Sequence, residues 1–112
     1  MALLKGTLDA LVLKALSSGP RHAFEITRWI EEGSAGEIPI EAPALLQALH
    51  RLEEKRLLTG EWGVTENNRR ARYYTLTPAG RTHLRAETES LQQSVAALAA
   101  LLQFRPSPRG GR

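Results

Sequence analysis

The amino-acid sequence predicts a mainly helical fold in which three short helices are followed by a two-stranded hairpin and a long C-terminal helix. Two observations lead to this prediction. Apolar residues recur at helical spacing in four separate stretches. Between the third and the fourth, residues 60–77 have the sequence GEWGVTENNRRARYYTLT, in which Asn67 and Asn68 are turn residues that tolerate positive φ. A hairpin of two strands is marginal alone in water, so the helices must support it.

The length, charge and composition of the chain exclude several kinds of protein. A chain of 112 residues is expected to form one domain. Lys and Arg number 15 against 12 for Asp and Glu, a mild excess, so the position of the charge matters more than its sum. Without cysteine the chain has no disulfide, thiolate zinc site or cysteine nucleophile. No apolar run is long enough to span a membrane and no signal-peptide pattern is present, so we expect a soluble cytoplasmic protein.

The first two helices have different surfaces. We expect the first from residue 3 to residue 17, apolar nearly all round, which indicates burial from more than one side. In so short a chain the second side is expected to be another subunit. The second helix, residues 22–32, is net acidic and is a poor candidate for contact with phosphates. Beyond it, Ile38 and Ile40 could form a brief edge strand or fill the core.

The third helix is predicted from Pro43 to about residue 56, since proline is preorganised for the first helical position. Leu45, Leu49 and Leu52 recur at i, i+4 and i+7 and define a buried stripe. The polar or small residues that point largely the other way are Ala44, Gln47, His50, Arg51 and Glu54.

Three short helices followed by a hairpin is the order of elements in a winged helix-turn-helix, whose last helix enters the major groove of DNA. Gln47 and Arg51 lie four residues apart on one helix face, which suits contact with bases or with the backbone, and His50 is expected to touch phosphate. By themselves, arginines at a hairpin tip could be a solvated surface. Beside a helix-turn-helix they are expected to contact DNA, and they are Arg69, Arg70 and Arg72.

The fourth helix is predicted to begin with Thr77 as N-cap and Pro78 at the first position, and to continue to about Gln103. It carries apolar residues spaced 7, 4, 3 and 4 apart, a coiled-coil-like seam: Leu84, Leu91, Val95, Leu98 and Leu102. The seam could belong to the core, to a dimer or to a surface for another protein. The dimer is favoured because the first helix offers a matching apolar face. The expected dimer interface comprises Leu4, Leu8, Leu11, Leu91, Val95, Leu98 and Leu102.

The predicted organisation is therefore a winged helix-turn-helix over residues 1–77, a dimerisation helix over 78–104 and a disordered tail over 105–112, which is rich in Pro, Gly and Arg.

Several motifs in this order resemble those of the PadR-like transcriptional regulators, in particular the short subgroup with a single C-terminal helix. They are LKGTLD (4–9), GPRHAF (19–24), ALHRLE (48–53), EWG (61–63), ENNRRARYYTLT (66–77) and Ala79-Gly80. The resemblance implies a homodimeric winged-helix repressor that binds a palindromic operator, with a dimer formed by the first and last helices. Members commonly release DNA when they bind phenolic acids or hydrophobic drugs, so a small hydrophobic effector is an expected partner.

The chain departs from the family pattern mainly at the start of the third helix. The usual Gly-Thr-Leu-Tyr-Pro-Ala-Leu is PALLQAL here, residues 43–49. The positions whose Thr and Tyr face DNA in the family hold Ala44 and Leu46, which offer only apolar contact to a thymine methyl, whereas Gln47 could contact adenine. A competing hypothesis is thus a winged-helix protein-interaction module that has lost sequence-specific DNA binding. A third is a small-molecule sensor with no DNA target.

Catalysis and metal binding are not indicated. The three histidines lie on three predicted helices, and His83 with Glu87 supplies only two ligands. No nucleophile elbow, phosphate-binding glycine loop or carboxylate pair is present, so we predict neither an enzyme nor a cofactor. Trp29 and Trp62 are interpreted as packing residues, and Trp62 is expected to stack across the hairpin on Tyr73 or Tyr74.

Overall fold

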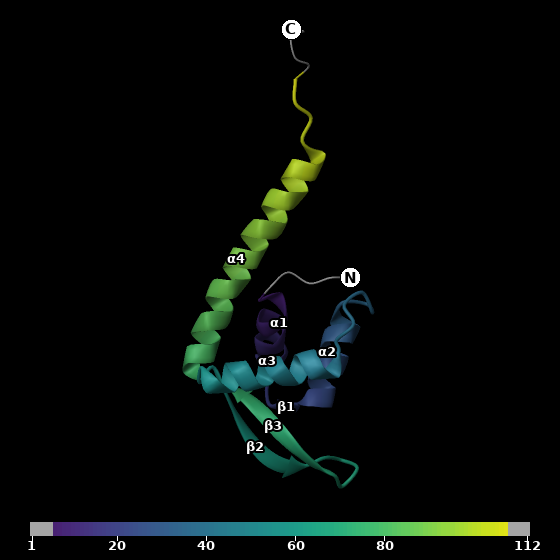
Figure 1. Ribbon diagram of the computed structural model, residues 1–112, viewed down its shortest axis with the longest axis vertical. Helices are drawn as coiled ribbons and strands as arrows, with labels where there is room; N and C mark the ends of the chain where they lie inside the picture. The colour runs from purple at the N-terminus through teal and green to yellow at the C-terminus, as the bar shows by residue number, and fades with distance from the viewer. Residues whose placement is uncertain (1–5, 108–112) are drawn as a thin grey trace.

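The computed structural model describes residues 6–107, and the fold is a small helical body with two projections (Figure 1). The β2–β3 hairpin, here called the wing, extends from one end of the body, and α4 extends from the other. The elements are α1 (Thr7–Ala15), β1 (Arg21–His22), α2 (Ala23–Gly33), α3 (Ala42–Glu54), β2 (Leu58–Val64), β3 (Arg70–Leu76) and α4 (Pro78–Gln103). The predicted mainly helical, winged helix-turn-helix fold is confirmed.

The core lies where α1 packs against α2, α3 and the first part of α4. The predicted stripe of α3 is confirmed, because Leu45, Leu49 and Leu52 are almost completely buried. Each such side chain contributes about 1.5–3 kcal/mol by leaving water. The other large side chains that are fully buried are Val12, Leu13, Leu16, Ile26 and Leu58.

Helix α1 is shorter than predicted at its C-terminal end, which lies at Ala15 and not at residue 17. Its N-cap is Gly6 with φ of 85°, and the predicted start at residue 3, together with Leu4, lies outside the described residues. Leu13 faces the core, whereas Leu8 and Leu11 pack against its edge and are half-buried. One side of α1 therefore keeps part of its apolar surface exposed in this structure.

Helix α3 ends at Glu54, two residues before the predicted end, because Arg56 adopts a left-handed conformation with φ of 60°. The Leu57 amide donates to the carbonyl of Leu52 and the Arg56 amide donates to that of Glu53. This pair of hydrogen bonds is a Schellman cap, in which glycine usually takes the left-handed position. The cap turns the chain directly into β2.

The sheet has three strands in the order β1-β3-β2, all antiparallel, so the sequence missed one strand. In β1, Arg21 pairs with Tyr74 and His22 pairs with Tyr73. A strand of two residues is too short to show the alternation that identifies a strand in a sequence. Strand β1 also directly precedes α2, where the sequence predicted only the start of a helix.

Ile38 and Ile40 were expected to form a brief edge strand or to fill the core. They form no strand in the described chain and pack against the core.

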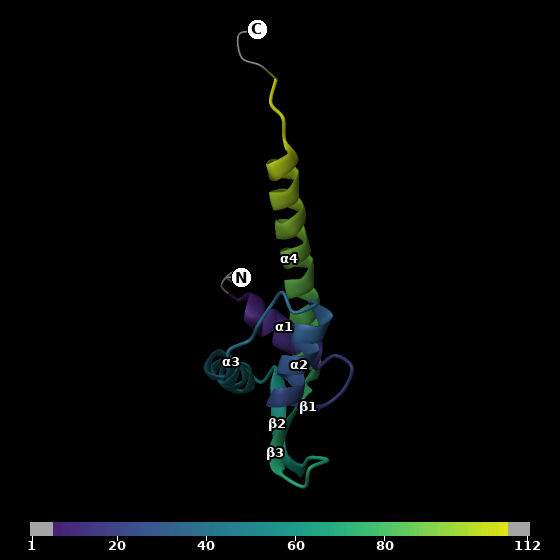
Figure 2. The same ribbon diagram turned by 90° about the vertical axis from the view of Figure 1, so that its right-hand side faces the viewer.

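Helix α4 agrees with the prediction at both ends. The Thr77 hydroxyl accepts from the Gly80 amide at 3.0 Å and donates to the carbonyl of Arg56 at 2.8 Å, so one side chain caps α4 and ties it to the end of α3. The first part of α4 packs against α1, and the remainder extends away from the body (Figure 2). Every described residue from Gln92 onward is exposed.

Gly80 marks the tightest contact between α4 and the turn after α3. A Cβ at this position would overlap the carbonyl oxygen of Leu57, which also accepts from the Thr77 amide. We expect Gly80→Ala to lower the free energy of unfolding by about 3 kcal/mol or more, since overpacking against fixed backbone is costly. The measurement is urea denaturation.

Gly33 is the control, because nothing lies within 4 Å of the Cβ that Gly33→Ala would add. That change should be neutral or stabilise the chain by about 0.4–1 kcal/mol. Equal stability of the two variants would contradict the packing described for Gly80.

Candidate nucleic-acid interface

The exposed face of α3 brings together four of the residues predicted to contact DNA. Leu46, Gln47, His50 and Arg51 line one shallow hollow. The Leu46 side chain is unusual there because it is apolar and 54% exposed. Ala44, two residues before Leu46, is half-buried and does not line the hollow.

A groove between α3 and the wing continues from this hollow. It is lined by side chains of both elements: Leu46, His50, Glu53, Glu54, Arg72 and Tyr74. Because Leu46 and His50 belong to both the hollow and the groove, the helix face and the wing form one continuous surface. Figure 2 shows α3 end-on beside the wing, with no other element between them.

Arg72 joins the two sides of the groove. Its guanidinium forms an ion pair with the Glu53 carboxylate on α3, and this carboxylate raises the pKa of Arg72 above its ordinary value. The side chain crosses β2 at Gly60, where a Cβ would overlap it. Burial raises the pKa of Tyr74 beside it, an effect that the nearby guanidinium partly opposes. Glu53 and Arg72 are 19 residues apart, so their spacing along the chain does not indicate this pair.

Arg51 is also paired. Its guanidinium donates to the Asp9 carboxylate of α1 at 2.7 Å, while the side chain remains about half exposed. The contact spans 42 residues of sequence and links α1 to the exposed face of α3. His50 and Glu54 approach to 3.5 Å on the same helix, an ion pair only when the histidine is protonated.

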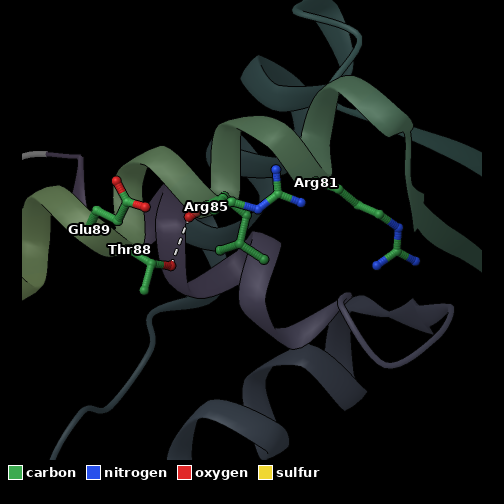
Figure 3. Close-up of a pocket in the computed structure, with 5 residues that line it drawn as sticks. Arg81, Arg85, Thr88 and Glu89 are labelled. Atoms are coloured by element: carbon green, nitrogen blue, oxygen red, sulfur yellow. Dashed lines mark hydrogen bonds between the residues drawn. The ribbon is translucent and has the colours of Figure 1, made fainter.

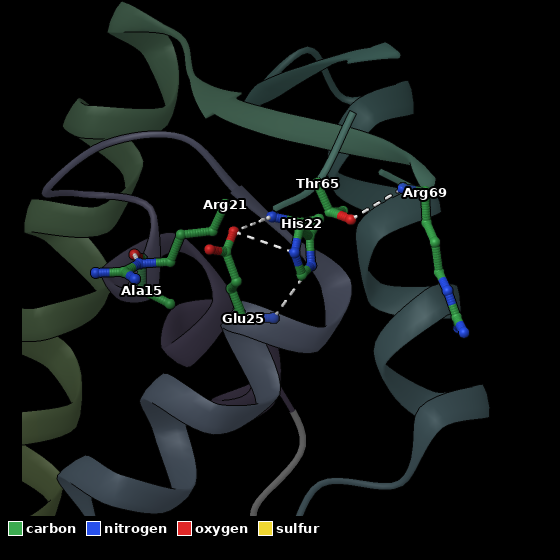
Figure 4. A network of polar contacts seen from close by, with 6 residues as sticks. All are labelled: Ala15, Arg21, His22, Glu25, Thr65 and Arg69. Carbon is green, nitrogen blue, oxygen red and sulfur yellow. Dashed lines mark hydrogen bonds and ion pairs between the residues drawn. The ribbon is translucent and has the colours of Figure 1, made fainter. Parts of the chain in front are cut away.

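The tip of the wing holds the other two predicted arginines, Arg69 and Arg70. Asn68 has φ of 59°, as the turn prediction required. The Thr65 hydroxyl accepts from the Arg69 amide at 3.3 Å, and the Arg69 side chain extends away from the turn (Figure 4). Within residues 6–107, neither arginine forms an ion pair, so their charges are not neutralised by a nearby carboxylate.

The base of the wing is fixed by His22. The Glu25 amide donates to its Nδ1 and the His22 amide donates to the Glu25 carboxylate, a reciprocal cap of α2 (Figure 4). The His22 ring meets the edge of Tyr73 on β3 at 5.3 Å between centroids. Arg21 adds a 2.8 Å hydrogen bond from Nε to the carbonyl of Ala15. The wing is thereby attached to α1 and α2 as well as to α3.

The prediction for Trp62 was wrong. It pairs with Arg72 across the hairpin and stacks on no tyrosine. The guanidinium carbons of Arg70 and Arg72 lie 4.9 and 5.9 Å from its ring centroid, and the side chain is 61% exposed. The register places Tyr73 opposite Glu61 and Tyr74 opposite Gly60, and this register could not be deduced from the alternation of side chains along each strand. Trp29, in contrast, packs against the core as predicted.

A second open hollow follows α4 and is lined by Arg81, Leu84, Arg85, Thr88 and Glu89 (Figure 3). Thr88 donates its hydroxyl to the Leu84 carbonyl at 2.7 Å, so this polar group is satisfied within the helix.

No cluster of three His, Cys, Asp or Glu suitable for a metal occurs between residues 6 and 107. No helix in that range is long and apolar enough to cross a membrane.

The sequence model of the transcriptional regulator PadR-like family matches residues 12–86, which include α2, α3, the wing and the start of α4. The chain belongs to this family. The PadR-like family consists of regulators of transcription, and the match covers the groove and both of its walls.

Two solved structures share the fold of this PadR-like chain, and a further protein is similar to it in sequence. A transcriptional regulator from Clostridium thermocellum superposes with a TM-score of 0.79 at 23% identity, over 88% of this chain and 96% of that one. Bacillus subtilis PadR in complex with operator DNA gives a TM-score of 0.65 at 18% identity, over 92% of this chain but 51% of that one. An uncharacterized 37.1 kDa protein in a transposon of Streptomyces fradiae is 40% identical over 81 residues, and the chain spans only 22% of its length.

Proposed function

We propose that the chain is a homodimeric DNA-binding repressor whose α3 enters the major groove while the wing arginines contact the flanking backbone. One observation carries the proposal: the exposed face of α3 and the wing form a single surface, and the arginines at its outer end are unpaired in the described chain. A duplex resting on α3 would place its phosphates near that end. The DNA complex of the similar Bacillus subtilis PadR supports the proposal.

The proposed contacts divide by chemistry. Leu46 would contact the methyl group of a thymine, and Gln47 would form two hydrogen bonds to an adenine. His50 and Arg51 would contact phosphate, and Arg51 would do so while held in place by Asp9. Ala44, half-buried, would add only a small apolar contact at the edge.

The wing would contact the DNA backbone. Arg69 and Arg70 would bind phosphates directly. Arg72 would lie near the DNA, and its pair with Glu53 would hold the wing against α3.

The proposed dimer would bury the exposed seam of α4. Val95, Leu98 and Leu102 are all more than half exposed, Leu91 is half-buried, and all four lie on one side of the helix. Leu8 and Leu11 on α1 offer further half-buried apolar surface, and Leu4 lies outside the described residues. Two copies would present two α3 helices to half-sites of a palindromic operator about one helical turn apart.

An effector, if the chain binds one, would sit between subunits. The hollow on α4 is open and is lined mostly by charged and polar side chains, so a single protomer encloses no apolar site there. A small hydrophobic molecule would bind there only if a second subunit covered the hollow and enclosed it. Contact with chromosomal DNA would place the protein in the cytoplasm.

A second candidate function is a winged-helix protein-interaction module without sequence-specific DNA binding. It is favoured by the apolar Leu46 at the centre of the exposed α3 face and by the carboxylates that already pair with Arg51 and Arg72. Such a module would bind DNA weakly and without sequence preference.

The wing can be tested by removing both unpaired arginines. Arg69→Ala combined with Arg70→Ala should weaken binding to selected and random duplexes alike. Each lost phosphate contact should lower the slope of log affinity against log salt by about one unit, so the slope should fall by about two for each bound protomer and by about four for the proposed dimer. Fluorescence anisotropy of labelled DNA at several salt concentrations measures both quantities.

The matched control removes the same net charge elsewhere. Arg28 lies on α2, where it pairs with Glu32, and Arg105 follows α4. The double variant Arg28→Ala, Arg105→Ala should keep the wild-type slope. An unchanged slope in the wing variant would refute the proposed phosphate contacts.

The dimer can be tested with a charge placed in the seam. Leu98→Glu should raise the dissociation constant of the dimer at least about a hundredfold, since an unpaired buried carboxylate costs about 3–5 kcal/mol. Light scattering at micromolar concentration should give the mass of a dimer for the wild type and of a monomer for this variant. Ala100→Glu, on the opposite side of α4, should remain dimeric. A monomeric wild type would rule the proposal out.

A further inference from the structure

Trp62 is the largest exposed apolar side chain of the wing and has no packing role that accounts for it. It is absent from the hydrophobic core, and the guanidinium groups of Arg70 and Arg72 lie over its ring. Val64, two residues along β2, is 62% exposed as well. Single exposed apolar residues are common, but two on one strand face, flanked by cations, form a surface of definite character.

The strand alternation decides which way this surface points. Successive side chains of a strand alternate between faces, so Gly60, Trp62 and Val64 share one face of β2. Their partners on β3 are Tyr74, Arg72 and Arg70 in register. Arg72 reaches across Gly60 to Glu53 of α3, so this face of the wing is the one turned toward α3. Trp62 therefore lies on the outward continuation of the groove between α3 and the wing.

Charge indicates what can cover Trp62. At the inner end of the groove, Glu53 neutralises Arg72, and Glu54 adds a further carboxylate. At the outer end, Arg70 lies over the indole and has no carboxylate partner within residues 6–107. A ligand that seats on this face must combine negative charge at the tip with apolar surface beside it. The sugar–phosphate backbone of a duplex has that pattern, because each phosphate is flanked by deoxyribose carbons.

We infer that Trp62 is a further DNA-contacting residue, whose indole packs against the deoxyribose edge of the duplex next to the phosphates bound by Arg69 and Arg70. The inference rests on the proposed function, since it requires a duplex on α3. The contact is apolar, so it adds affinity without adding a phosphate contact. Arg70 stacks on the ring and reaches phosphate from there.

The direct test uses Trp29→Phe, which leaves Trp62 as the sole tryptophan. Acrylamide, a neutral quencher that DNA does not repel, reports the accessibility of the indole. With a duplex of mixed sequence about three helical turns long, added at low salt until anisotropy shows saturation, the quenching constant should fall several-fold. The same constant with and without bound duplex would overturn the inference while leaving the proposed function intact. Protection by a single-stranded oligonucleotide and not by the duplex would overturn it too.

Substitution provides an independent test. Trp62→Ala should weaken duplex binding roughly tenfold, comparable to the loss of an aromatic contact to nucleic acid elsewhere. Because no phosphate contact is lost, the salt slope should stay unchanged, unlike that of Arg70→Ala. Trp62→Phe should recover part of the affinity.

Phe24 provides the matched control, because it is 65% exposed and also lies under an arginine, Arg28, at 5.9 Å. That pair sits on the net-acidic α2, where Arg28 already has a carboxylate partner. Phe24→Ala should leave DNA affinity unchanged. Equal losses from Phe24→Ala and Trp62→Ala would overturn the inference, because they would indicate a general effect of removing an exposed aromatic residue. Failure of every form of the chain to bind any duplex would refute the proposed function itself.

Discussion

The ion pair between Arg72 and Glu53 is the contact on which the geometry of the proposed interface depends. A two-stranded hairpin is marginal by itself, and its direction relative to a helix is free unless something fixes it. Here the Schellman cap at Arg56 sets the angle at which the chain leaves α3, and β1 pairs with the far edge of β3. Arg72 then closes the remaining gap by crossing Gly60 to reach α3. The helix face and the wing are consequently joined into one continuous surface.

The arginines of the proposed interface fall into two groups, one paired with carboxylates and one not. Arg51 and Arg72 lie near α3 and are paired with carboxylates, whereas Arg69 and Arg70 lie at the tip and are unpaired in the described chain. Contacts to phosphate position a protein on DNA, and contacts to base edges specify the sequence. On the proposed function, the tip would supply most of the affinity. The choice of sequence would then depend on Leu46 and Gln47, the side chains that distinguish this chain from the usual family pattern.

Local signals in the sequence predicted the features that depend on neighbouring residues. Thr77-Pro78 predicted the start of α4, the spacing of Leu45, Leu49 and Leu52 predicted the buried face of α3, and Asn68 predicted the turn of the wing. The features it missed depend on contacts between distant residues. Asp9 with Arg51 and Glu53 with Arg72 are set by packing, not by spacing. Strand β1 has two residues and is too short to show the alternation of a strand. The sequence does not reveal the register of the hairpin, so the expected stacking of Trp62 on a tyrosine was wrong.

On the proposed function, α3 and the wing of two subunits together bind a two-fold symmetric DNA site. Selection of bound fragments from random-sequence duplex DNA, followed by hydroxyl-radical footprinting of the selected site, tests it most directly. We predict one enriched motif with two-fold symmetry and two protected half-sites about one helical turn apart, with added backbone protection where the wings lie. Enrichment of no motif, with only weak and salt-sensitive binding to all duplexes, would contradict it and favour the interaction module.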